Sequence, residues 1–253
     1  MTSSITADQA GRLLSSFSSF LTVAIHSLLF HRALYPARSF LTTRAYTLPV
    51  HQSRHPGVCT WVTDAVAAVA AQIRSGAALA VVLAIHAPQS MTVLERWVFD
   101  LQSFPASWGD AVGDGGGGGG APVVDALGVG PSAASGAAAA GGLADTSVEG
   151  EDEVNWADVN EGLRGALRRI AYAGEKSPPL PENCTFTLAV ELRDESEAPI
   201  GHPQAWIPAQ AKVSGVPGPR DMNTAPIRSV RAGPLFFECW LEKKTEAQES
   251  QDS

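Results

Sequence analysis

Two neighbouring apolar segments between residues 79 and 101 restrict the fold more than any other part of the chain. The first, residues 79–85, is a short unbroken apolar run whose β-branched content favours a strand covered on both faces. Turn residues follow, and residues 93–102 then alternate between apolar and polar side chains. We therefore predict an antiparallel hairpin with a central first strand and a half-buried second strand. Glu95 is the exception on the apolar side of the second strand.

Three further segments carry apolar residues at helical spacing, and we predict that each is a helix with one buried face. The first extends over residues 8–34, because a proline follows soon after it. The second opens at Pro56 and is stopped by a glycine, and the third follows the acidic residues 151–153. Gly162 and Gly165 each weaken the third helix by up to ~1 kcal/mol relative to alanine, so we expect packing to hold it.

The remaining segments alternate between extended and irregular character. Residues 40–50 are extended but irregular, with a proline suited to an edge or a turn, and residues 184–192 alternate as a strand. Residues 193–234 form a long, polar, proline-rich connection, which we expect to lack regular structure and to serve a function. The chain closes with a strand over residues 235–242. Its outward side chains include two large aromatics that suit a partner-binding surface, Phe236 and Trp240.

These segments predict an α+β fold, with a mostly antiparallel sheet and three helices packed on it. We expect one domain over residues 8–243, interrupted by a Gly/Ala-rich insert at residues 106–150 and followed by a flexible tail at residues 244–253. The insert has too little apolar surface to offset its chain entropy, so we expect it to be disordered. Its glycine run lacks the Lys-Ser/Thr pair of a phosphate-binding loop.

Charge and cysteine content narrow the function classes. The net charge of −8 disfavours direct, specific binding to nucleic acid, because such binding needs a concentrated basic surface. Cys59, Cys184 and Cys239 have no paired spacing, so we expect reduced thiols and an intracellular location. No unbroken apolar run reaches the ~18 residues of a membrane span. The first segment is Ser-rich and poor in acidic residues, so a mitochondrial protein whose first helix is cleaved as a transit peptide remains an alternative.

The sequence carries no enzyme signature and no motif that implies a cofactor. It lacks a nucleophile elbow, a His-Glu-x-x-His motif and paired zinc-binding cysteines. His51, His55 and Cys59 are spaced by four residues, which leaves open a metal hydrolase as an alternative. Prolines interrupt the helix that would align these three side chains, and a fourth ligand is missing, so we predict no metal site.

The order of elements, together with several short motifs, resembles the HORMA domain. Within that family the chain is most similar to the accessory, non-catalytic subunits of the translesion DNA polymerase zeta, in a fungal form. Spindle-checkpoint HORMA proteins are related to these and share part of the pattern. The residues that carry the resemblance are Leu34-Tyr35-Pro36, residues 49–56, residues 93–100, Asn183-Cys184-Thr185-Phe186-Thr187 and residues 226–242.

The resemblance implies an adaptor that acts by clamping a peptide. In HORMA proteins a C-terminal segment, here residues 193–243, is a "safety belt" that folds over a peptide from a partner. The peptide adds to the sheet as a strand. The resemblance implies that Tyr35 and Trp61 line the peptide pocket and that Trp206 braces the belt. The guest would be a peptide of the polymerase zeta catalytic subunit.

The resemblance also implies further partners and a location in the nucleus. Thr224, Glu238 and Trp240 match a surface that holds the C-terminal domain of the scaffold Y-family translesion polymerase. Arg164 matches a position in the interface between two HORMA domains. No membrane and no direct DNA contact is implied. An adaptor of the spindle-checkpoint type, which would bind checkpoint peptides instead, remains the alternative.

Overall fold

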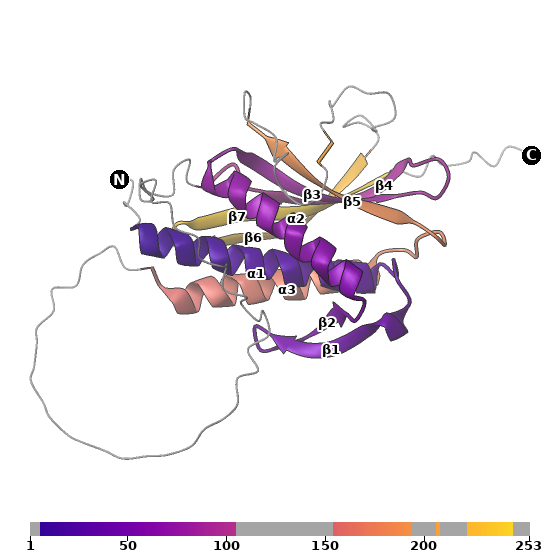
Figure 1. The fold of residues 1–253 in the computed structure, drawn as a ribbon, viewed down its shortest axis with the longest axis horizontal. Helices are drawn as coiled ribbons and strands as arrows, with labels where there is room; N and C mark the ends of the chain where they lie inside the picture. Colours follow the sequence, from indigo (N-terminus) through magenta and orange to yellow (C-terminus); the bar gives the residue numbers. More distant parts are fainter. Residues whose placement is uncertain (1–5, 105–153, 194–205, 208–221, 245–253) are drawn as a thin grey trace, which may run out of the picture.

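The computed structural model describes residues 6–104, 154–193, 206–207 and 222–244 (Figure 1). The predicted disordered insert and nearly all of the predicted tail lie outside these residues. The helices are α1 (Ala7–His31), α2 (Pro56–Arg74) and α3 (Trp156–Lys176), with a short 3-10 turn, η1 (Ala37–Ser39). The strands are β1 (Phe40–Ala45), β2 (Leu48–Ser53), β3 (Ala78–His86), β4 (Val93–Asp100), β5 (Thr185–Leu192), β6 (Met222–Ala232) and β7 (Leu235–Lys244).

The predicted hairpin is confirmed and forms the middle of a five-stranded sheet. The strand order is β5-β3-β4-β7-β6, and every neighbouring pair is antiparallel. Both hairpin strands are interior, because β3 pairs with β5 and β4 pairs with the C-terminal strand β7. The second strand is therefore as central as the first, contrary to our expectation of a half-buried strand. The two sheet edges are β5 and β6.

The helices cover one face of this sheet (Figure 1). Helices α1 and α3 lie side by side, and α2 lies across α1. An aromatic cluster joins α1 to the sheet: the rings of Phe17 and Phe20 lie 5.2 and 5.3 Å from that of Phe237 in β7, between ring centroids. Phe20 also contacts Phe99 of β4, and all four side chains are fully buried. Helix α1 is thus the centre of the core.

The apolar character of α1 reflects this burial. By length and hydropathy α1 could cross a membrane, and 67% of its most apolar 18-residue window is buried in the domain. The sequence prediction considered only unbroken apolar runs and so missed this property of the helix. Cleavage of α1 as a targeting segment would remove the side chains around which the sheet packs.

Helix α1 ends at His31, three residues before the predicted end at Leu34. The helix is capped by Arg32, and Ala33 adopts a left-handed φ of 51°. The side chain of Arg32 turns into the core instead of continuing on the helix surface. A residue that leaves the helix in this way has no signal in the local apolar pattern.

Two segments have more structure than predicted. Residues 40–53 are not irregular but form the separate two-stranded sheet β1-β2, in which Pro49 lies opposite Arg44. Both strands of such a pair are edges, so proline is tolerated there. The stretch predicted to lack structure between residues 193 and 234 contains the 11-residue strand β6. Its proline, Pro226, sits at a break in the pairing register on the outer edge of the sheet, where the lost N–H bond does no harm.

Two glycines of α3 allow β6 to approach the helix closely. A Cβ on Gly162 would lie 3.1 Å from the Cγ1 atom of Val230, and a Cβ on Gly165 would lie 2.8 Å from the Cζ atom of Arg228. The predicted weakness of this helix is therefore matched by packing against the sheet. The helix is also capped at its start by the Asn155 side chain, which accepts from two backbone N–H groups.

The opposite face of the sheet carries a small apolar cluster formed by Ala80, Val82, Ala84 and Val98. Trp240 packs against this cluster, and its indole N–H donates to Glu242 at 2.8 Å. Arg96 reaches across the strands and donates to Glu191 and Glu242, at 2.8 and 2.6 Å. Side chains of the sheet itself, with polar ends that are paired, therefore contribute to covering this second face.

Candidate functional site

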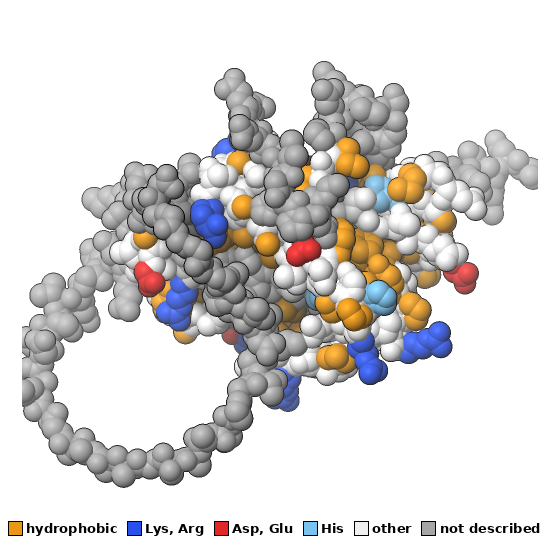
Figure 2. Space-filling model, viewed as in Figure 1, with side chains coloured by type: hydrophobic (Ala, Val, Ile, Leu, Met, Phe, Trp, Pro, Cys, Tyr) orange, Lys and Arg blue, Asp and Glu red, His pale blue; other side chains and the backbone are white. Residues whose placement is uncertain are grey.

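The main candidate site is a cavity of about 730 Å³ next to the start of β5. Three parts of the chain build it: the segment from α1 to η1, the end of β2 together with the first two turns of α2, and the beginning of β5. The lining residues are Leu34, Tyr35, Pro36, Ser39, Ser53, His55, Gly57, Val58, Trp61, Cys184, Thr185 and Phe186. On the face shown in Figure 2, hydrophobic side chains gather in this region of the molecule.

Three aromatic rings define the cavity. The ring of Phe186 lies 5.2 Å from that of Trp61 and 6.2 Å from that of Tyr35, between centroids, and both contacts are edge-to-face. Phe186 thus lies against both side chains that the family resemblance suggested. All three are only partly buried, so part of each ring's apolar surface is exposed. The geometry brings Tyr35 and Trp61 into one cavity, and their role in binding a peptide stays a prediction.

The cavity adjoins an unpaired strand edge. Strand β5 pairs with β3 along its whole length, from His86–Thr185 to Ala78–Leu192. On its other side no strand lies among the described residues. Backbone N–H and C=O groups along such an edge are a template for another extended chain. A guest strand paired with β5 could place a side chain in the cavity, because Thr185 and Phe186 belong to both.

Trp206 was predicted to brace a belt over this site. It is half-buried and packs against the core, but it is not among the residues that line the cavity. Its indole N–H is buried, and it has no acceptor among the described residues. Such a donor is costly to leave unpaired, which makes Trp206 a place where an added backbone carbonyl would stabilise the fold.

The thiols near the cavity are not activated, and His51 faces another part of the core. The Cys59 thiol donates to the Ser53 carbonyl at 3.1 Å, and burial raises the pKa of Cys59 and of Cys184. Both thiols therefore stay protonated and are poor nucleophiles near neutral pH. The His51 ring stacks on Phe30 at 3.5 Å instead of facing the cavity. In the described parts of the chain, no three His, Cys, Asp or Glu side chains are grouped to hold a metal ion.

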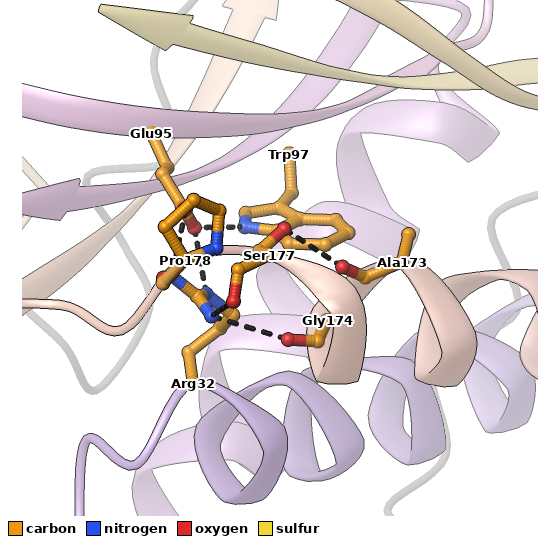
Figure 3. Close-up of polar contacts among 7 residues, drawn as sticks. All are labelled: Arg32, Glu95, Trp97, Ala173, Gly174, Ser177 and Pro178. Carbon is orange, nitrogen blue, oxygen red and sulfur yellow. Dashed lines mark hydrogen bonds and ion pairs between the residues drawn. The ribbon is translucent and has the colours of Figure 1, made fainter.

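A buried polar network joins the end of α1, strand β4 and the linker that leads into β5 (Figure 3). The Arg32 guanidinium donates two hydrogen bonds to the Glu95 carboxylate, at 2.9 and 2.8 Å, and Trp97 donates a third at 3.1 Å. Arg32 also donates to the carbonyls of Gly174, Ser177 and Pro178, at 3.1, 3.3 and 2.7 Å. The network therefore fixes the end of α3 and the linker that leads into β5. It also explains why Glu95 lies on the apolar side of β4.

The residues of the predicted second surface lie on the sheet face that is opposite to the helices. Glu238 and Trp240 are alternate residues of β7. Thr224 of β6 lies across from Glu242, which is the next alternate residue of β7. Thr224 and Glu238 are exposed, and Trp240 is half-buried. The structure therefore brings the three onto one face of two neighbouring strands. Whether a polymerase binds there stays a prediction.

The predicted dimer residue, Arg164, lies on the partly exposed side of α3. Its guanidinium forms an ion pair with Glu161 at 2.6 Å, which lowers the pKa of that carboxyl. Its role in an interface is likewise untested by the geometry.

Sequence reasoning missed two residues that matter for the site. Phe186 was given no role beyond its place in a strand and in the family motif, although it forms one wall of the cavity. Arg32 received no role, because its partner Glu95 is 63 positions away along the chain. The one available signal for this pair was a carboxylate at an apolar position of β4.

Comparison of the sequence with known proteins gives two findings. A family model of the HORMA domain matches residues 14–232. A relative from Schizosaccharomyces pombe, the DNA polymerase zeta processivity subunit, is 26% identical over 232 residues, which cover 90% of this chain and 92% of that protein.

Solved structures show the same fold. A chain of a mitotic checkpoint complex has a TM-score of 0.62 at 20% identity and covers 91% of this chain and 99% of its own. Caenorhabditis elegans HTP-1 bound to a HIM-3 closure motif has a TM-score of 0.52 at 16% identity and covers 94% of this chain and 91% of its own. At these identities the likeness concerns the fold alone.

Proposed function

Because this chain belongs to the HORMA domain family, we propose that it is a non-catalytic adaptor subunit of a translesion DNA polymerase. In this role it binds a peptide of the polymerase zeta catalytic subunit. The named relative supports the choice of polymerase, because it matches along nearly the whole of both chains. Two solved neighbours of the same fold, Caenorhabditis elegans HTP-1 and HTP-2, are bound to a HIM-3 closure motif, which supports peptide binding as the general mode.

The observation that carries the proposal is the unpaired edge of β5 next to an aromatic cavity. Peptides that add to a sheet gain affinity from backbone hydrogen bonds, and side-chain pockets supply the selectivity. Here the edge of β5 could supply the backbone hydrogen bonds. The cavity walls Tyr35, Trp61 and Phe186 could supply the selective side-chain pocket. The cavity volume of about 730 Å³ is enough for one or two large side chains.

We further propose that residues 193–243 close over the bound peptide as a safety belt. Trp206 supports this, because it comes from the connection between β5 and β6 and still packs against the core. Its unpaired indole N–H would be satisfied by a carbonyl of the guest or of the belt. A belt of this kind slows dissociation more than it speeds association, so we expect long-lived complexes.

The test is peptide binding by a chain with a single altered cavity wall. Overlapping peptides that cover the catalytic subunit would be titrated by fluorescence polarisation against the unaltered chain and against Trp61→Ala. Loss of a central aromatic anchor costs about 2 kcal/mol or more, so we expect at least about a 30-fold weaker affinity. Trp240→Ala, on the opposite sheet face, is the matched control. Unchanged affinity in a folded Trp61→Ala protein would contradict the proposal.

We propose two additional contacts and a location from the family resemblance. Thr224, Glu238 and Trp240 would bind the C-terminal domain of a Y-family polymerase, which Trp240→Ala should weaken in a pull-down. Arg164 would stabilise a HORMA dimer, so Arg164→Ala should shift any dimer to monomer in sedimentation. A tagged chain should be found in the nucleus by microscopy. Failure of any one of these would leave peptide binding itself untouched.

A further inference from the structure

The N-terminal part of the chain has a charge that is opposite to that of the whole. Between Asp8 and Asp64 the sequence contains five arginines and no aspartate or glutamate, although the net charge of the chain is −8. Three of these arginines, Arg38, Arg44 and Arg54, are exposed and belong to η1, β1 and the residue after β2. The β1-β2 region is therefore a local basic surface on an acidic protein.

Two of the three arginines lie next to the cavity. Arg38 directly precedes Ser39, and Arg54 directly follows Ser53, and both serines line the cavity. A hydrogen bond from the Arg54 N–H to the Ser39 carbonyl, at 2.8 Å, holds these two points of the chain together. Figure 2 shows Lys and Arg side chains along the lower edge of this face, below the hydrophobic region. Arg38 and Arg54 are therefore each one residue away from the lining of the cavity, on the side of η1 and β2, and we call this pair the basic rim.

This rim has no internal neutralising partner within the described chain. Neither the Arg38 nor the Arg54 guanidinium forms a hydrogen bond or ion pair with a described residue, and no carboxylate lines the cavity. The other described arginines near the site, such as Arg32, are fully paired. The two rim guanidinium groups are therefore available to a bound ligand.

We propose that the guest peptide carries an acidic residue close to the apolar side chain that fills the cavity. This acidic residue would lie on the side of the cavity that Ser39 and Ser53 line. The inference rests on the proposed peptide-binding function and adds a charge requirement to it. A carboxylate on that flank would meet Arg38 and Arg54 at the rim, where guanidinium groups bind carboxylates bidentately. The charge pair would favour peptides with an acidic flank and disfavour those with a basic one.

Nucleic acid is a poorer fit for this rim. Binding to a phosphate backbone at physiological salt needs several neutralised phosphates, and the rim offers two arginines on a chain of net charge −8. An aromatic cavity directly beside the rim fits a side chain of a peptide better than a stiff duplex.

The experiment reverses the charge at the rim. Peptides of 20 residues that cover the polymerase zeta catalytic subunit would first be screened against the unaltered chain in 50 mM salt. The best binder would then be titrated against the double variant Arg38→Glu/Arg54→Glu. We expect affinity to fall about tenfold, because each reversed contact changes a partly screened ion pair from attractive to repulsive. Replacing the acidic residues of the peptide by glutamine should have a similar effect on the unaltered chain.

Arg44→Glu is the matched control. Arg44 lies in the same hairpin and is equally exposed, but it pairs with Pro49 at the end far from Ser53. It makes half the change in net charge of the double variant, so a general electrostatic effect would appear in Arg44→Glu as about half of the loss in binding free energy. We expect Arg44→Glu to stay within about twofold of the unaltered chain, because Arg44 lies near the end of the β1-β2 pair away from Ser53 and interactions of exposed charges weaken with distance.

The outcomes separate the two proposals. If the peptide is lost in Trp61→Ala but binds equally well to Arg38→Glu/Arg54→Glu, the charge requirement is wrong and peptide binding stands. If no peptide binds the unaltered chain, both are wrong. If the double variant instead loses affinity for a labelled 30-base-pair DNA duplex and for no peptide, the rim serves nucleic acid and the inference is overturned.

Discussion

Replacing Arg32 by methionine should be among the most damaging single changes in the described domain. The side chains of Arg32 and Glu95 are only 3% and 5% exposed, and the Arg32 guanidinium donates five hydrogen bonds. Methionine has a similar length and is apolar, so it fills the space without donating a hydrogen bond. The change therefore isolates the polar function of the side chain from its volume.

The magnitude follows from what Arg32→Met leaves behind. The buried Glu95 carboxylate would keep the Trp97 indole N–H as its one hydrogen-bond donor among the described side chains. Breaking a buried ion pair by removing one partner costs about 3–5 kcal/mol. The carbonyls of Gly174, Ser177 and Pro178 would also lose a donor, at about 1 kcal/mol or more where water does not replace it. We expect a total loss in the free energy of unfolding of about 4–6 kcal/mol.

The assay is urea unfolding at pH 7, followed by tryptophan fluorescence and far-UV circular dichroism. The double variant Arg32→Met/Glu95→Leu removes the orphaned charge, so it should be more stable than Arg32→Met by about 2 kcal/mol. It should still be less stable than the unaltered chain, because the three carbonyls remain without their donor. Arg164→Met is the control, since its ion pair with Glu161 lies at the surface and should hardly affect the midpoint.

A loss below about 1 kcal/mol in Arg32→Met would refute this reasoning, since it would mean that water solvates the network freely. A double variant less stable than Arg32→Met would refute it too, because the orphaned carboxylate would then not be the source of the cost. Because the network fixes the linker into β5, peptide affinity should fall together with stability.

Two further predictions concern proton binding and helix packing. Burial lowers the pKa of His26 to about 4, so between pH 6.5 and pH 4 the unfolded chain binds more protons than the folded one. Stability should therefore fall as the pH drops through this window, by at most about 3 kcal/mol from His26, and His26→Leu should flatten the profile measured by urea unfolding. His31 and His51, whose pKa values burial also lowers, should leave a smaller slope of the same sign. In α3, Gly165→Ala should raise the free energy of unfolding by up to about 1 kcal/mol, because the Arg228 head group can swing away. Gly174→Ala should lower it by about 1–2 kcal/mol, because its Cβ would lie 3.0 Å from the Cβ atom of His31 in α1. Equal effects at both glycines would contradict this account.

The parts of the fold that follow from local periodicity could be predicted from the sequence. Strand β3 is visible as an unbroken apolar run, β4 as an alternation with a period of two, and the three helices as apolar patterns with a period of about 3.6 residues. Strand β6 was missed, because a proline and several exposed polar residues hide the alternation on an edge strand. The end of α1 was misplaced for a different reason: Arg32 leaves the helix to meet a partner on β4.

The candidate site was predictable only in part. Tyr35 and Trp61 came from family resemblance, and they do lie in one cavity. Phe186 joins them only because β5 pairs with β3, a long-range register that apolar spacing does not encode. The free edge of β5 also depends on which side of the sheet the C-terminal hairpin occupies. Spacing along the chain carries no information on that choice.

The strand order β5-β3-β4-β7-β6 has a consequence for chain length. The chain departs from one border of the sheet at Leu192 and resumes at Met222 on the opposite border. Leu192 and Met222 also lie at opposite ends of the strands, because Leu192 pairs with Ala78 and Met222 pairs with Lys244. Four inter-strand steps of about 4.8 Å and about seven residues along the strands therefore separate them, a span of roughly 30 Å that about nine extended residues could bridge. The 29 residues from 193 to 221 greatly exceed that minimum. The connection is therefore long enough to pass around a bound polypeptide without disturbing the pairing of either edge strand.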